Sequence, residues 1–229
     1  MKFLKVMFLA VSLVPAVALA QVCTQGGELV FTQPPNQVNG LFSDADCDGC
    51  ASGMQSIADD FMLAGSTNIG ELQLYGGYFP TNVPSDPDDI TVIFHEDLGG
   101  LPGAAISTQA SVSATKIDTG VDLFGVDEYF FVLTLANPVR LSAGHFWVEI
   151  FNNTAGTTES FFWETGDLSP ISGVFDGAFS VDTPGGAWGA LGGVDMAFNM
   201  CTAVNKPIPT LGNPGLLALI ALLGLFLPM

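Results

Sequence analysis

Hydrophobic and polar residues alternate in short runs along most of the chain. Segments rich in Val, Ile, Phe, Tyr and Thr are separated by clusters of Gly, Pro, Asn and Asp. None of the segments between them has the repeat of an amphipathic helix. This pattern predicts strands over Glu28–Thr32, Ala58–Leu63, Glu71–Phe79, Ile90–His95, Ala110–Ile117, Glu128–Ala136, His145–Asn152, Ser160–Glu164, Val174–Val181 and Val194–Cys201.

Two of these segments indicate how the strands are arranged. Ile90, Val92 and Phe94 fall on one face of their strand, as expected when one side of a sheet is buried. The segment Glu128–Leu135 is apolar on both faces, which suits a central strand that is covered on each side. We therefore expect an all-β fold, an antiparallel β-sandwich of the jelly-roll or immunoglobulin-like type.

The first twenty residues have the features of a secretory signal peptide. Lys2 and Lys5 form a short basic region, an apolar run follows, and Ala18-Leu19-Ala20 is an A-x-A cleavage site. We expect residues 1–20 to form a signal helix that is removed on export. The remaining chain divides into a β-sandwich domain over residues 21–204 and a linker with a hydrophobic tail over residues 205–229.

The composition indicates a folded, strongly acidic domain. Hydrophobic residues make up 48% of the chain and include 18 Phe, which is enough for a packed core. Without the two signal lysines, three Lys and Arg residues remain against 23 acids, a net charge of −20 (3 − 23). Such a charge repels phosphate backbones and excludes nucleic acid as a partner. It also favours divalent cations, which bind to carboxylate and carbonyl oxygens.

Four cysteines, an even number in a chain with an export signal, predict disulfide bonds. Cys23 and Cys201 lie near the two ends of the domain, so a bond between them would join its termini. Cys47 and Cys50 would then close a short ring. Three connectivities are possible, and we favour this one. A zinc site is disfavoured because the chain contains a single C-x-x-C and neither histidine lies near it.

The end of the chain carries a short motif before an apolar run. The motif consists of Ile208, Pro209, Thr210 and Leu211, and Gly215 begins a run without charged residues that predicts a C-terminal hydrophobic helix. These residues resemble the bacterial IPTL-CTERM sorting tail. The resemblance implies delivery to the cell envelope, with the membrane or a sorting machinery as the partner of the tail.

Three short motifs inside the domain carry a looser likeness. They are Ala58-Asp-Asp-Phe61, Gly76-Gly-Tyr-Phe79 and Gly100-Leu-Pro-Gly103. They are similar to a recurring class of bacterial secreted β-sandwich domains that carry C-terminal sorting tails. The likeness implies a surface or matrix protein and supplies no catalytic residues.

An acidic loop is the candidate metal site. Asp44, Asp46 and Asp48 precede Gly49 in a D-x-D-x-D-G pattern, the opening of an EF-hand-like calcium loop. Alternate carboxylates can converge on one hard cation, and the glycine permits the sharp turn. Gln55 takes the twelfth position, where a bidentate Glu is usual. We consider Ca²⁺ a possible ligand here, with a solvated acidic loop as the alternative.

The two histidines mark the candidate ligand-binding face. His145, Trp147 and Glu149 alternate along one strand, so their side chains should project from the same face. A hydrolase could use His145 with Glu149, or His95 with Asp97, as an acid–base pair. A carbohydrate-binding module could use Trp147 as a flat platform. No serine stands in a G-x-S-x-G setting, and a mixed polar strand face without catalysis is the favoured interpretation.

The sequence as a whole predicts an exported protein of the cell envelope, cell surface or extracellular matrix. Its expected role is structural or adhesive, with surface polysaccharide or matrix as a possible partner, and it is not expected to be an enzyme. A carbohydrate-binding module is the first alternative and a secreted hydrolase the second. The arrangement of the aromatic and histidine side chains in the fold discriminates between these three functions.

Overall fold

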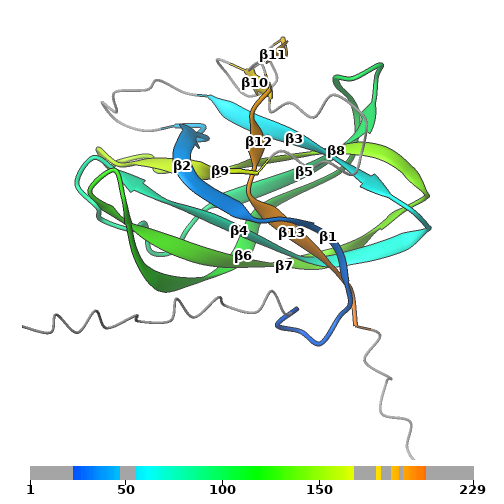
Figure 1. Cartoon of the computed structure of the whole chain (residues 1–229), viewed down its shortest axis with the longest axis horizontal. Helices are drawn as coiled ribbons and strands as arrows, with labels where there is room; N and C mark the ends of the chain where they lie inside the picture. Colours follow the sequence, from blue (N-terminus) through cyan, green and yellow to red (C-terminus); the bar gives the residue numbers. More distant parts are fainter. Residues whose placement is uncertain (1–22, 47–54, 168–178, 182–186, 191–192, 205–229) are drawn as a thin grey trace, which may run out of the picture.

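The computed structural model describes residues 23–46, 55–167, 179–181, 187–190 and 193–204. These ranges form strands and turns and contain no helix (Figure 1). The strands are β1 Leu29–Gln33, β2 Pro35–Phe42, β3 Ser56–Leu63, β4 Thr67–Phe79, β5 Ile90–Asp97, β6 Pro102–Leu123, β7 Val126–Leu141, β8 Gly144–Phe151, β9 Ser160–Gly166, β10 Phe179–Val181, β11 Gly189–Ala190, β12 Asp195–Met196 and β13 Phe198–Thr202.

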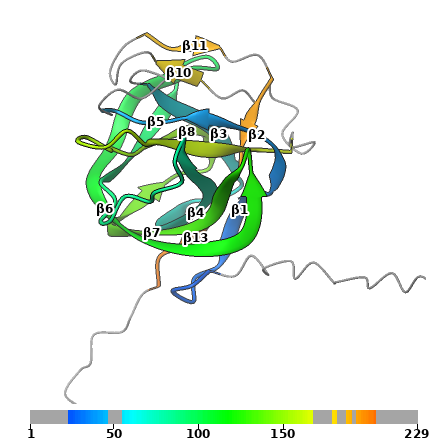
Figure 2. The same cartoon turned by 90° about the vertical axis from the view of Figure 1, so that its left-hand side faces the viewer.

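The strands form one antiparallel sheet that curls into two facing layers. The order of neighbouring strands is β1-β13-β4-β7-β6-β5-β8-β3-β10-β11. β9 lies outside this linear order and pairs with β2, β4 and β12. β4, β7 and β13 lie in one layer and β3, β5 and β8 in the other (Figure 2). β6 connects the layers because its first half pairs with β5 and its second half with β7. At the change of partner, Ser111 has a φ of 49°.

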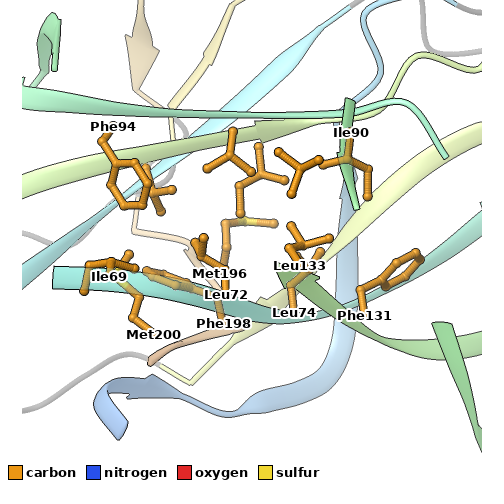
Figure 3. Packing of buried hydrophobic residues seen from close by; sticks show 14 of the residues in the cluster. Ile69, Leu72, Leu74, Ile90, Phe94, Phe131, Leu133, Met196, Phe198 and Met200 are labelled. Carbon is orange, nitrogen blue, oxygen red and sulfur yellow. The ribbon is translucent and has the colours of Figure 1, made fainter. Parts of the chain in front are cut away.

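The hydrophobic core fills the space between the two layers. Side chains of β4, β7 and β13 point toward those of β5 (Figure 3). Alternation along each strand selects these residues, as in β8, where Val148 and Ile150 are fully buried in the core. The rings of Phe94, Phe131 and Phe198 are fully buried and are among the largest side chains of this core.

Gly76 lets β4 exchange one neighbouring strand for another. On one edge, β4 pairs with β13 as far as Leu74 and with β9 from Gly76 onward, while β7 lies along its other edge. A Cβ atom at this position would lie 2.2 Å from the carbonyl oxygen of Phe162. Only a residue without a side chain permits this approach, so the glycine is required for β9 to cross beside β4.

The predicted Cys23–Cys201 disulfide is confirmed. The two residues are 178 positions apart in sequence, and the bond joins the chain before β1 to β13. β1 and β13 are themselves paired, with Leu29 opposite Cys201. The bond therefore fastens the beginning and the end of the described domain at one place. The second predicted pair, Cys47 and Cys50, lies outside the described residues.

The all-β, antiparallel prediction is confirmed, while several strand boundaries were wrong. The strand predicted at Ala110–Ile117 is part of the much longer β6, whose polar sequence hides its length. β2 was missed, because Pro35, two asparagines and a glycine read as a turn. The predicted signal helix and C-terminal hydrophobic helix fall in residues 1–22 and 205–229, which the structure does not describe. None of the described segments forms a helix that could span a lipid bilayer.

Candidate functional site

The predicted ligand-binding residues lie together on the outer face of the β3-β8-β5 layer. In β8, Val148 and Ile150 face the core, so His145, Trp147 and Glu149 point to the opposite side. β3 and β5 flank β8 on either side. The outward side chains of all three strands can therefore meet on this face.

The first histidine pair joins β5 to β8. His95 lies directly opposite Trp147 in the ladder. Its Nε2 is 2.9 Å from Glu149 Oε2, and its Nδ1 is 3.1 Å from the carbonyl oxygen of Gly103. Both ring nitrogens therefore face oxygen atoms of the protein. The half-buried ring of Trp188 packs edge-on against this imidazole, with 5.9 Å between the ring centroids.

The second histidine joins all three strands. His145 Nε2 is 2.6 Å from Asp60 Oδ2 on β3, and its Nδ1 is 3.2 Å from Asp97 Oδ1 on β5. The hydrogen bond to Asp60 raises the pKa of His145, burial opposes this, and the two nearby carboxylates add to the rise. A histidine held between two carboxylates is stabilised in its charged form.

Asp97 is the shared acceptor at the exposed end of this cluster. It receives hydrogen bonds from Trp147 Nε1 at 3.0 Å and from the Gly100 amide at 3.0 Å. Partial burial alone would raise the pKa of Asp97, but these hydrogen bonds and the nearby His145 lower it below the usual value. Asp97 therefore keeps its charge and fixes the orientation of the Trp147 indole.

The histidine–carboxylate pairs differ from the two that the sequence suggested. His95 contacts Glu149, and His145 contacts Asp60 and Asp97. Sequence reasoning missed Asp60. Alternation in the predicted strand Ala58–Leu63 does place Asp60 on the face opposite to the core residue Phe61. Only the register between β3 and β8 shows that this face brings Asp60 next to His145.

The side chains of this cluster are buried or already hydrogen-bonded to one another, and they connect neighbouring strands of the sheet. Trp147 is 0% exposed, and Asp60 and Glu149 are also buried. Each nitrogen of His95 and His145 already faces an oxygen atom, so neither ring offers a free nitrogen to take a proton from a substrate. The buried indole cannot serve as a platform for a sugar ring. The arrangement links β3, β5 and β8 through side chains on their outer face.

A cleft of about 600 Å³ lies elsewhere on the domain. It is bordered by the Asn36–Asn39 segment of β2, by Thr165–Asp167 and by Gly193–Asp195. Its polar side chains bond to one another, with Thr165 Oγ1 2.8 Å from Asn36 Oδ1. No histidine lines the cleft.

The predicted calcium residues are only partly described. Asp44 is fully buried, and its carboxylate accepts hydrogen bonds from Thr154 and from the Phe161 amide. Burial raises the pKa of Asp44, and these hydrogen bonds oppose the rise. Gln55 pairs with Asp44 through backbone hydrogen bonds, whereas Asp48 lies outside the described residues. The calcium site in this loop stays a prediction.

Two further findings limit the assignment of a site. Across the described ranges, no three His, Cys, Asp or Glu side chains gather in a way that could hold a metal ion. The sorting residues Ile208–Leu211 and Gly215 fall beyond the described part of the chain, so the tail stays a prediction.

Comparison with known proteins assigns no family. No protein-family model matches the chain, and neither the curated proteins nor the solved structures contain a significant match. Any functional conclusion therefore depends on the fold and on the chemistry of its side chains.

Proposed function

We propose that the chain is an exported protein of the cell envelope or extracellular matrix with a structural or adhesive role, and that it is not an enzyme. A secretory signal at residues 1–20 and a sorting tail that begins at Ile208 would deliver it. The domain between them would be displayed at the surface or in the matrix. Its partners would be the sorting machinery or membrane, and surface polysaccharide or matrix.

The Cys23–Cys201 disulfide is the observation that carries this proposal. Disulfides form and persist in oxidising compartments outside the cytosol. This one fastens the two ends of the described domain to each other, where a signal segment and a tail would adjoin it. A domain closed in this way retains its fold outside the cell, as a structural protein must.

Within the all-β class, we assign the domain to the jelly-roll type rather than the immunoglobulin-like type. The assignment uses eight strands in chain order, β1, β3, β4, β5, β6, β7, β8 and β13. One layer then has the order β1-β13-β4-β7, and the other has the order β3-β8-β5-β6. With the eight strands numbered one to eight in chain order, these layers read 1-8-3-6 and 2-7-4-5. Two interlocked Greek keys produce this order, whereas immunoglobulin domains divide seven strands differently.

The outer-face cluster supports a structural role over both alternatives. A hydrolase that uses histidine as its general base needs a ring nitrogen free to accept a proton, and both histidines have their nitrogens opposite oxygen atoms. A carbohydrate-binding module needs exposed, flat aromatic rings, and Trp147 and Trp163 are fully buried. Trp188 is the half-buried indole that could contact a sugar.

Deletion of residues 215–229 tests the proposed delivery. In a bacterial strain that produces the protein, we expect the deletion to move the domain from the envelope fraction into the medium. The matched control is the double variant Pro209→Ala, Thr210→Ala, which keeps the apolar run and changes only the motif. It should remain in the membrane fraction with its tail intact. Equal amounts of wild type and deletion variant in the medium would contradict a sorting role.

A binding measurement separates the structural role from sugar recognition. Purified domain is mixed with polysaccharide from the envelope of the same strain, and the Trp188→Ala variant is compared with the wild type. We expect equal retention of the two proteins. Retention that the substitution abolishes would replace the structural proposal with carbohydrate binding.

A further inference from the structure

A second pair of acidic side chains meets on the outer face of the opposite layer. Glu128 belongs to β7 and Glu164 to β9, and their exposed fractions are 1% and 0%. β4 runs between the two strands. Its Gly76 is paired with Tyr129 on one side and Trp163 on the other. Glu128 precedes Tyr129 and Glu164 follows Trp163, so the two glutamates flank β4 diagonally, one residue to either side of Gly76.

Polar oxygen-bearing groups surround this carboxylate pair. The Gln37 amide N–H donates to Glu164 Oε1 at 2.8 Å, and its side-chain amide is 3.4 Å from Glu128 Oε1. The Thr119 hydroxyl is 2.6 Å from Glu128 Oε2 and 3.2 Å from the Glu128 carbonyl oxygen. Gln37 takes a φ of 54°. The residues come from β2, β6, β7 and β9, so tertiary pairing alone assembles them.

One oxygen of the pair is left without a donor. Glu164 Oε2 is buried, and no hydrogen-bond donor in the described ranges reaches it. Removing a carboxylate oxygen from water without a partner is costly. Burial and the adjacent Glu128 carboxyl raise the pKa of Glu164 to about 9. At neutral pH the metal-free pair therefore keeps one proton, and two ionised carboxylates at this place would need a positive charge to balance them.

The two described basic side chains do not supply this charge. Lys116 bonds to Asp88 and to the Ser85 carbonyl oxygen. Arg140 lies at the other end of the β4–β7 ladder, opposite Asn68. Both histidines belong to the cluster on the other layer. Among the described residues, therefore, no basic side chain balances the two carboxylates. A cation from solution could displace the proton of the pair, and a chain with a net charge of −18 attracts such ions.

We propose that Glu128 and Glu164 bind a hard divalent cation of the Ca²⁺ class. The two carboxylates supply the charge, and the Thr119 hydroxyl and the Gln37 side-chain amide lie where they can supply neutral oxygens. A half-turn of the Gln37 side-chain amide about its terminal bond exchanges its nitrogen and oxygen and points the oxygen at the ion. Ca²⁺ accepts such mixed carboxylate, amide and hydroxyl ligands in flexible geometry. The site is separate from the acidic loop at residues 44–55 and does not depend on the proposed function.

The test is a Ca²⁺ titration of the full domain after treatment with EDTA and removal of the chelator. Isothermal titration calorimetry measures affinity. Luminescence of Tb³⁺, used as a Ca²⁺ substitute, reports an ion near Tyr75, whose hydroxyl pKa is raised by burial and by the nearby charges of Glu128 and Glu164. We expect saturable 1:1 binding in the wild type. Glu164→Gln should weaken it at least ten-fold, because one of two charged ligands becomes neutral.

Two controls make the result specific to this pair. The double variant Asp46→Asn, Asp48→Asn alters the acidic loop and should bind as the wild type does. Thr119→Val keeps both carboxylates and the fold and should weaken binding less than Glu164→Gln. If Glu164→Gln fails to fold, Thr119→Val and the wild-type titration still decide.

Two outcomes would overturn the proposal. In the first, the wild type shows no saturable binding, which would assign a shared proton to the pair. In the second, Glu164→Gln or Thr119→Val binds Ca²⁺ as tightly as the wild type, while the loop variant loses binding. That result would place the ion at the loop.

Discussion

Replacing both Cys23 and Cys201 with alanine should lower the free energy of unfolding by about 3–5 kcal/mol. The bond closes a loop across 178 residues of sequence. In the chain-entropy account, a loop of this length corresponds to about 5 kcal/mol at 25 °C, and residual structure in the denatured state lowers this value. Alanine leaves no polar atom in these two buried positions.

Urea unfolding followed by tryptophan fluorescence measures this loss, because Trp147 and Trp163 are fully buried in the native state. With a slope of about 2 kcal/mol per molar urea, the midpoint should fall by about 1.5–2.5 M. The control is Cys47→Ala, Cys50→Ala, which keeps the long loop closed. A midpoint that falls by less than about 0.5 M, at an unchanged slope, would refute the claim that the bond between the ends stabilises the domain.

Three further predictions follow from the packing and from the outer-face cluster. Gly76→Ala should destabilise the domain by about 1–3 kcal/mol through overpacking. The control Gly65→Ala has open space around its added Cβ and should change stability by less than about 0.5 kcal/mol. Thermal denaturation compares the two variants, and equal midpoints would contradict the close crossing of β9 beside Gly76. Trp147→Ala should cost about 3–5 kcal/mol in urea unfolding, and a neutral result would mean that the indole is not buried. His145→Gln should remove the stabilisation that the charged imidazole provides, which is fully present below about pH 6.5 and is lost as pH rises through the raised pKa of His145. The difference in urea midpoint between wild type and variant should therefore become smaller from about pH 6 to about pH 9. A difference that grows over this range would contradict the ion pairs with Asp60 and Asp97.

Local patterns in the sequence predicted the features that depend on one strand at a time. Alternation placed His145, Trp147 and Glu149 on one face, and it holds in the structure because Val148 faces the core. The all-β class followed from the same pattern. The end-to-end disulfide was predicted as well, since Cys23 lies near the start of the domain and its partner near the end.

Features that depend on the pairing between strands could not be predicted. His95 meets Glu149 and His145 meets Asp60 because of the register of β5, β8 and β3, which no local period contains. The Glu128–Glu164 pair forms only because β4 changes its neighbour from β13 to β9 at Gly76. This pairing joins residues far apart in the chain. Polar strands such as β6, which joins the two layers, also lack the apolar alternation by which a strand is recognised.

The measurement that tests the central claim most directly is the intact mass and cysteine state of the protein recovered from fractionated cells and medium. An exported structural protein should appear in the envelope or the medium, should lack residues 1–20 and most of residues 215–229, and should show Cys23 and Cys201 protected from alkylation until a reductant is added. Recovery of the full-length chain from the cytosol, with both thiols open to alkylation, would contradict the account.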